Sequence, residues 1–180
     1  YGSRAASGVV IITTKKGKTG DLKVKFDAQA QLYWLPRYDL MDAETYKVYD
    51  DRAYAEAMLQ GVSGVTGYQN HYEGNTDWQD EMLKTGILQN YNVSLSGGTD
   101  NIKYYTSINY KNDDGALYST GFSQTGFRIN TSGKKKWFEY GENFFYTRSD
   151  TKRLNGNPWA NFITMSPTIS VYDTNHSGGY

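Results

Sequence analysis

Residues 23–34, KVKFDAQAQLYW, alternate between polar and apolar side chains without interruption. Because successive side chains of a strand point to opposite sides, this alternation predicts a β-strand with one apolar and one polar face. The segment is about as long as the 9 to 11 residues that a tilted strand needs to cross a lipid bilayer. Pro36 ends the pattern, and the apolar set is Val24, Phe26, Ala28, Ala30, Leu32 and Trp34.

Four further segments alternate in the same way, at residues 89–96, 102–110, 122–131 and 138–146. In the last of them, Phe138, Tyr140, Phe144 and Tyr146 share one face with Glu142. The aromatic residues on the apolar faces admit two interpretations: girdles at the lipid interfaces of a membrane barrel, or the core of a soluble two-sheet sandwich. They include Trp34, Tyr104, Tyr110, Phe144 and Tyr146.

The connections between these strands alternate in predicted length. Those after 23–34, 102–110 and 138–146 are expected to be long, the second of them covering 111–121, whereas those after 89–96 and 122–131 are tight. Transmembrane barrels place short turns on the periplasmic side and long loops outside. The order therefore favours strands that pass up and down through one membrane. From residue 147 onward the alternation is lost in a polar segment.

Three segments between or after the strands carry helix signals. Residues 42–60 repeat apolar side chains at helical spacing, with Asp42 as N-cap and Gly61 as the stop. In NTDWQDEML, Thr76 and Gln79 have the spacing of a capping box. One or two helical turns are expected between Trp159 and Met165.

The composition excludes some classes and leaves others open. With 19 basic and 19 acidic residues the net charge is zero, so no nucleic-acid partner is predicted. There is no cysteine, hence no disulfide framework or thiolate metal site. The 17 tyrosines and 19 glycines are typical of outer-membrane β-barrels, in which every second residue faces water and mean hydropathy stays low, here −0.71. Five strands are too few to close a barrel, which needs about 8, so a longer chain is expected.

Longer motifs carry a family likeness. YGSRAASGVVIITTKKGK resembles the stretch that closes the plug domain of SusC/RagA-type TonB-linked outer-membrane transporters, with Val9–Ile12 as a strand covered on both faces. NTDWQDEMLKTG, QNYNVSLSGGTDNIKYYTSINY and GENFFY resemble the first extracellular loop and early barrel strands of that family, in the family's order. MSPTISVYDTNHSGG resembles a later loop motif.

The resemblance implies an all-β membrane protein, a plug-filled antiparallel transmembrane β-barrel with short helices in extracellular loops. Residues 1–20 would be the C-terminal end of the plug, and residues 21–180 the N-terminal part of the barrel with its loops, about five strands. It also implies import of oligosaccharides or peptides across the bacterial outer membrane, with a SusD-like surface lipoprotein. The TonB complex would act through a segment upstream of Tyr1.

No residue pattern predicts catalysis, a cofactor or a metal site. His71 and Glu73 lack a second close ligand and are interpreted as solvated loop residues. Loop aromatics are the substrate-binding candidates, because aromatic rings stack on sugars, although plain packing is equally open: Tyr68, Tyr72 and Trp159. The alternative function is a secreted all-β carbohydrate-binding module, whose apolar faces would contact a second sheet instead of lipid.

Overall fold

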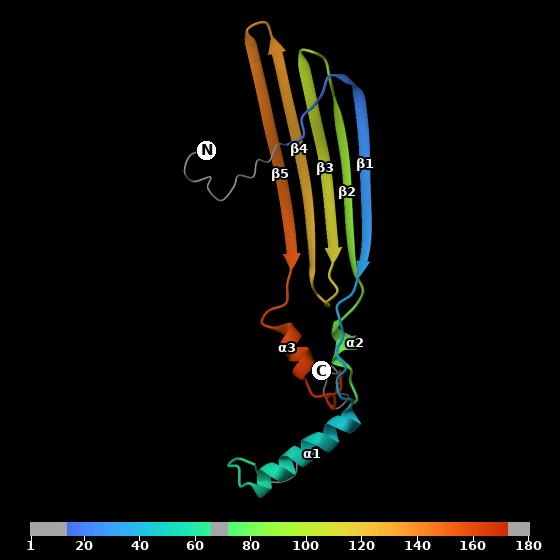
Figure 1. Cartoon of the computed structure of the whole chain (residues 1–180), viewed down its shortest axis with the longest axis vertical. Coiled ribbons are helices and arrows are strands. Elements are labelled where there is room, and N and C mark those ends of the chain that lie inside the picture. Colours follow the sequence, from blue (N-terminus) through green and yellow to red (C-terminus); the bar gives the residue numbers. More distant parts are fainter. Residues whose placement is uncertain (1–13, 66–71, 173–180) are drawn as a thin grey trace, which may run out of the picture. The chain divides into compact units, whose positions relative to one another are not determined.

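The computed structural model describes residues 14–65 and 72–172, and its main element is a five-stranded antiparallel sheet (Figure 1). Neighbours in sequence are neighbours in the sheet, in the order β1-β2-β3-β4-β5. All five predicted strands are confirmed, whereas the strand predicted over Val9–Ile12 lies outside the described residues. The strands are β1 Gly20–Tyr33, β2 Gly86–Gly98, β3 Ile102–Asp114, β4 Gly121–Lys135 and β5 Phe138–Lys152.

The strands extend beyond the alternating segments, which corrects two predictions. β3 continues to Asp114, so its connection to β4 covers only residues 115–120 and is not the predicted long loop over 111–121. β5 continues through the polar residues 147–152, where Ser149 Oγ accepts a hydrogen bond from Gln124 Nε2 of β4 at 3.0 Å. The alternation missed these ends because ladder pairing uses the backbone and does not require apolar side chains.

The two tight connections are confirmed and lie at the same end of the sheet. Residues 99–101 join β2 to β3, and Lys136 and Trp137 join β4 to β5. Lys134 N, near the end of β4, donates to Asn101 O of the β2–β3 connection at 2.8 Å. Lys136 has a φ of 53°, a left-handed conformation that a two-residue hairpin turn requires of at least one residue.

Helices occupy the segments outside the sheet. α1, Ala43–Leu59, lies within the predicted range, and its N-cap Asp42 accepts a hydrogen bond from Thr45 N at 2.8 Å. α2 is Trp78–Met82 and α3 is Pro158–Thr164, where Asn157 accepts from Ala160 N at 3.3 Å. None of the helices in residues 14–65 and 72–172 is long and apolar enough to cross a membrane.

The predicted capping box at α2 is wrong. Asp77 is the N-cap and accepts from Gln79 N at 2.8 Å. Gln79, 3% exposed, turns its amide to Tyr38: Tyr38 N donates to Gln79 Oε1 at 2.8 Å, and Gln79 Nε2 donates to Tyr38 O at 2.9 Å. The Gln79 amide bonds to this backbone, 41 residues away in sequence, because both the N–H and the C=O of Tyr38 then have a hydrogen-bond partner.

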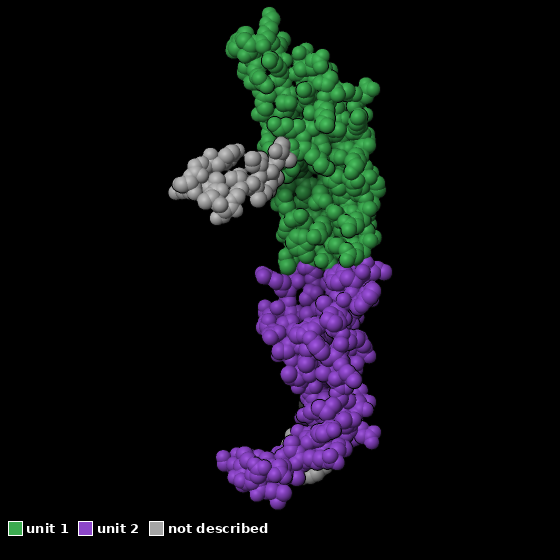
Figure 2. All heavy atoms as spheres, viewed as in Figure 1, with its two compact units in different colours: residues 1–31, 88–113, 122–151 green, residues 32–87, 114–121, 152–180 purple. Residues whose placement is uncertain are grey.

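The chain divides into two compact units, coloured separately in Figure 2. The strand unit comprises residues 1–31, 88–113 and 122–151, and the loop unit comprises residues 32–87, 114–121 and 152–180. In the loop unit, residues 74–78 pair with residues 166–169. Gly74 N donates to Thr168 O at 2.8 Å, Thr76 N to Pro167 O at 2.9 Å and Trp78 Nε1 to Ser166 O at 3.0 Å.

Candidate functional site

Contacts between neighbouring strands assign the polar face of the sheet. Asn109 Nδ2 of β3 donates to Asn90 Oδ1 of β2 at 2.9 Å, and Asn92 Nδ2 donates to Asp27 Oδ2 of β1 at 3.5 Å. Both contacts join side chains that the alternation placed on polar faces. Gln124 of β4 bonds to Ser149 of β5, and a Cβ added at Gly126 of β4 would lie 3.8 Å from both Asn109 Oδ1 of β3 and Thr147 Oγ1 of β5. The polar sides of all five strands therefore form one continuous surface, hereafter the polar face.

Residues 14–19, which lead into β1 and are called the crossing segment, run against this polar face (Figure 1). Asn130 Nδ2 of β4, in a residue only 6% exposed, donates to Lys15 O at 2.5 Å. A Cβ added at Gly17 would overlap the backbone N and O of Tyr104 in β3. Thr19 Oγ1 donates to Thr99 O at 3.5 Å. The segment thus crosses β4 and β3 before β1 begins, and Gly17 permits the close approach.

The opposite face of the sheet, hereafter the apolar face, is exposed. Phe127 of β4 and Phe144 of β5 meet edge to face there, with ring centroids 6.4 Å apart, which confirms the predicted facing of the last strand. Exposed apolar surface gathered on one face marks a site of contact with another protein, a ligand or a membrane. The exposed residues include Leu22, Val24, Phe26, Leu32, Ile102, Ile108, Tyr110, Phe138, Phe144 and Tyr146.

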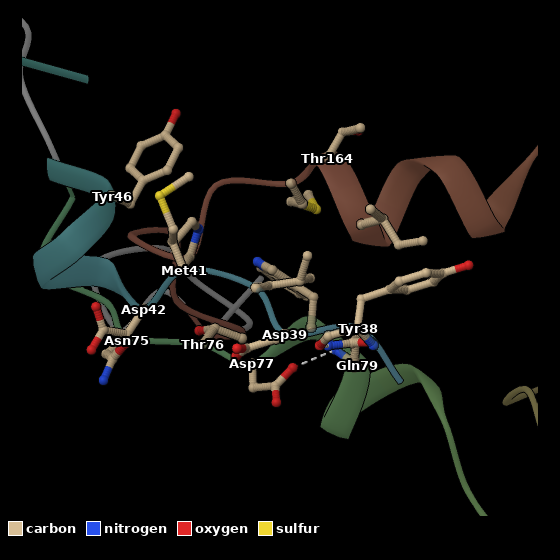
Figure 3. A pocket seen from close by; sticks show the side chains of 15 residues that line it. Tyr38, Asp39, Met41, Asp42, Tyr46, Asn75, Thr76, Asp77, Gln79 and Thr164 are labelled. Carbon is tan, nitrogen blue, oxygen red and sulfur yellow. Dashed lines mark hydrogen bonds between the residues drawn. The ribbon is translucent and has the colours of Figure 1, made fainter. Parts of the chain in front are cut away.

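The loop unit holds a cavity of about 410 Å³ (Figure 3). One side of its lining is polar, and Met41, Ile163, Met165 and Pro167 add apolar surface. The hydrogen bonds between Gln79 and Tyr38 hold one wall, and Ala43 N donates to Asn75 Oδ1 at 3.1 Å in another. No basic side chain of residues 14–65 and 72–172 lines the cavity. Its polar residues include Asp39, Asp42, Asn75, Thr76, Asp77 and Gln79.

Hydrogen bonds from Thr45 make the carboxyl group of Asp42, in this lining, more acidic. The hydroxyl of Thr45 and then its backbone N–H, both donating to the carboxylate, hold the pKa of Asp42 below its usual value of 3.8. Hydrogen bonds to a charged carboxylate favour the charged form. The carboxylate therefore stays ionised at neutral pH while it caps α1.

The predicted substrate-binding aromatics are not gathered at this cavity. Trp159 of α3 is half-buried between two rings, with its centroid 6.2 Å from Tyr38 and 5.1 Å from Phe162. Tyr72 is exposed, and neither Trp159 nor Tyr72 lines the cavity. Tyr68, like His71, lies outside the described residues. Their role in binding stays a prediction.

Sequence reasoning missed the residues that do line the cavity. Tyr38 and Asp39 lie in a segment without alternation or long helical periodicity, so no pattern pointed to them. The local signals were the N-cap chemistry of Asp42 and the capping-box spacing of Thr76 and Gln79, three of the lining residues. Among residues 14–65 and 72–172, no group of three or more His, Cys, Asp or Glu side chains is placed to hold a metal ion.

Known proteins resemble the chain in sequence and in fold. It is 36% identical over 151 residues to TonB-dependent receptor P3 of Formosa agariphila, covering 83% of this chain. Over 194 residues it is 28% identical to TonB-dependent receptor SusC of Bacteroides thetaiotaomicron, covering 100% of this chain. The fold of this chain matches part of the RagAB peptide importer. The TM-score is 0.63 at 22% identity for the closed-closed state and 0.64 at 23% identity for the open-open state.

The chain belongs to the SusC/RagA-type TonB-dependent receptors. It spans 14% of the length of receptor P3 and 18% of that of SusC. In the two RagAB structures, 86% and 84% of this chain match 21% and 20% of the solved chains. No protein-family model matches the chain.

The motifs shared with SusC/RagA-type receptors fall on defined elements. NTDWQDEMLKTG contains α2 and leads into β2, and QNYNVSLSGGTDNIKYYTSINY forms the hairpin of β2 and β3. The Ser-Pro of MSPTISVYDTNHSGG accepts the hydrogen bonds of Trp78 and Thr76. The first motif lies outside the described residues up to residue 13, and its last residues begin the crossing segment.

Proposed function

We propose that this chain forms the first wall strands and outer loops of an importer in the bacterial outer membrane, which takes up oligosaccharides or peptides and is energised through TonB. The two-sided sheet carries the proposal: its polar face holds the crossing segment, and its apolar face exposes aliphatic and aromatic side chains. Strands of a transmembrane barrel present an apolar side to lipid and a polar side to the lumen. Further strands of the protein would pair with β1 and β5, the edges of this sheet.

The domain boundary is part of the proposal. Residues 1–20 would end the plug, and residues 21–180 would begin the barrel. The path of the crossing segment supports this order, because it reaches β1 from the polar face, on which a domain filling the lumen would lie. In this arrangement the tight turns at 99–101 and 136–137 face the periplasm, and α1, α2 and α3 belong to loops outside.

The proposal extends to the substrate class and the partners. The relatives include SusC and the RagAB peptide importer, and we propose a SusD-like surface lipoprotein as the lid of this importer and TonB as its energy source. The cavity in the loop unit offers carboxylate, amide and hydroxyl groups. These groups suit the amino groups of a peptide or the hydroxyls of a sugar, and Tyr68, Tyr72 and Trp159 would add rings for stacking.

The lipid-facing side of β1 gives a direct test. In the full-length protein in liposomes, single cysteines replace the neighbours Ala28 and Gln29, and each carries a fluorophore. Lipids with a nitroxide on the acyl chain should quench the label at Ala28, and a water-soluble quencher should reach the label at Gln29 through the lumen. Equal quenching of both labels by the lipid would overturn the proposal, and protection of both from every quencher would support the two-sheet sandwich.

Transport requires a second test. Deletion of the gene should abolish growth of its host on one class of polymer, and uptake of labelled glycans and peptides will show which class. Trp159→Ala should then reduce uptake of that substrate, whereas Trp159→Phe, which keeps a ring, should retain it. Unchanged uptake in Trp159→Ala would remove this residue from the binding proposal without affecting the transport proposal.

A further inference from the structure

The end of the sheet that carries the two tight turns is basic. We call it the turn end, residues 18–23, 99–103 and 134–139; it contains six lysines and three acidic residues. At the opposite ends of β3 and β5, residues 111–114 and 147–152, three basic and three acidic residues balance. The lysines of the turn end are Lys18, Lys23, Lys103, Lys134, Lys135 and Lys136.

The three lysines at the end of β4 and in the β4–β5 turn have no acidic partners among the described residues. The ion pairs of residues 14–65 and 72–172 use other cations, and Lys134, Lys135 and Lys136 are all exposed. The bond from Lys134 N to Asn101 O holds the end of β4 against the β2–β3 turn. The positive charges of Lys134, Lys135 and Lys136 are therefore exposed on a part of the structure that this bond holds in place.

Aromatic side chains continue directly from these lysines. Trp137, at the tip of the turn, is 90% exposed, and its ring meets that of Phe138 at a centroid distance of 6.2 Å. Phe138 in turn stacks on Tyr140 at 6.1 Å, and both belong to the apolar face. In membrane proteins, basic side chains lie at the level of the headgroups, tryptophan at the interface and apolar side chains among the acyl chains. The turn end shows the same order.

We propose that the turn end binds the anionic headgroups of phospholipids in the leaflet that it reaches. Lysines near a membrane surface are attracted to anionic lipids, and the flexible stem of each lysine lets the ammonium group reach a phosphate while its methylenes stay against apolar surface. Trp137 takes the interfacial position beside them. This inference rests on the proposed function, since it needs the apolar face to lie in a bilayer.

The test uses the full-length protein in liposomes of phosphatidylcholine. Single cysteines at Phe138 and at Tyr146 carry a fluorophore; both residues lie on β5 and on the apolar face, and they are 54% and 56% exposed. Nitroxide-labelled phosphatidylglycerol and nitroxide-labelled phosphatidylcholine are compared as quenchers at equal mole fraction. The variant is Lys134→Gln with Lys135→Gln and Lys136→Gln, and its control is Lys152→Gln with Arg153→Gln.

We expect phosphatidylglycerol to be preferred at position 138 by roughly fivefold, about the contribution of one lysine at a membrane surface. The preference should be absent at position 146, weaken in high salt because exposed charges are screened, and disappear in the triple variant but not in its control. Equal quenching by both lipids at position 138, or a preference that the triple variant keeps, overturns this inference alone. Absence of quenching by either lipid at both positions overturns the proposed function.

Discussion

The strand unit and the loop unit reach their structures by different means. In the strand unit the backbone ladder forms the sheet, and most side chains are left exposed on two faces of opposite polarity. In the loop unit, side chains bond to backbone groups far away in sequence. Gln79 pairs with Tyr38, Thr76 Oγ1 donates to Ile169 O at 2.7 Å, and Trp78 Nε1 donates to Ser166 O.

Strand residues and residues of irregular segments differ in how specific their side chains must be. A strand position tolerates many side chains, provided that the polarity of the side chain suits the face of the sheet on which it lies. The strand unit therefore has one face compatible with lipid and one compatible with water. An irregular segment must satisfy buried backbone groups one at a time, so the loop unit depends on individual residues. Substitutions in the strands should therefore act through polarity, whereas those in the crossing segment and the loop unit should depend on the identity of the residue.

The largest effect is expected at Gln79 in the loop unit. Gln79→Ala leaves the N–H and C=O of Tyr38 without their partners and should reduce the free energy of local opening by about 3 kcal/mol, the cost of two unsatisfied groups. Hydrogen exchange of the amides of residues 74–79 in the full-length protein measures this. Gln60→Ala is the matched control, because the side-chain amide of exposed Gln60 donates to the side chain of exposed Glu56. Equal effects of both substitutions would contradict the role given to Gln79.

A smaller effect is expected at the one close backbone approach of the crossing segment. Gly17→Ala places a methyl group against the backbone of Tyr104, which cannot move without distorting β3, and should cost about 2 kcal/mol. Faster hydrogen exchange of residues 15–19 and a lower Tm of the full-length protein are the readouts. In Gly141→Ala, whose added Cβ has its nearest neighbour at 4.0 Å, both should stay near wild type. A tolerant Gly17 would mean that the crossing segment does not lie on β3.

A substitution at Trp78 can separate the contribution of its hydrogen bond from that of its ring packing in the loop unit. Trp78→Phe keeps a ring beside Met82 and removes the hydrogen bond to Ser166 O, and should cost about 1 kcal/mol. Hydrogen exchange of residues 166–169 measures the loss. An unchanged exchange rate there would show that the pairing of residues 74–78 with 166–169 holds without this bond, which would weaken the contrast between the two units.

The smallest effect depends on pH. The pKa of Asp42 is lowered in the folded state, so its stabilisation of α1 is fully present above 3.8 and is lost as the pH falls through the folded value. Protection of the amides of residues 43–46 should therefore fall in acid. Asp42→Asn accepts the same hydrogen bond without titrating, so its protection should not change with pH. A similar acid dependence in both proteins would assign the effect to another group.

Much of the strand unit was predictable, because alternation reports the two environments of a sheet directly. The facing of Phe144 and of Asn109 followed from sequence parity and was confirmed by contacts with Phe127 and Asn90. The strand ends were not predictable, since the polar residues 147–152 extend β5 through backbone pairing. The path of the crossing segment was not predictable for another reason. Its hydrogen bond joins Lys15 to Asn130, and these residues are too far apart in sequence for any local pattern to connect them.

The candidate site in the loop unit shows the limit of local rules. Asp42 was identified as an N-cap, because capping joins residues three apart and can be read locally. The spacing of Thr76 and Gln79 satisfied the capping-box rule, yet the structure uses Thr76 for Ile169 and Gln79 for Tyr38. A side chain with two possible partners takes the one that tertiary packing brings to it.

The sequence by itself determined the five strands, their two faces, the N-cap of α1 and, through its motifs, the family. These features depend on residues that are neighbours along the chain, and the period of a strand or helix makes them visible. Only the tertiary structure decided where β3 and β5 end, how the cavity near Tyr38 is built and which face the crossing segment follows. Those outcomes depend on which distant backbone groups meet, and hydrogen bonds over such separations leave no periodic trace in the sequence.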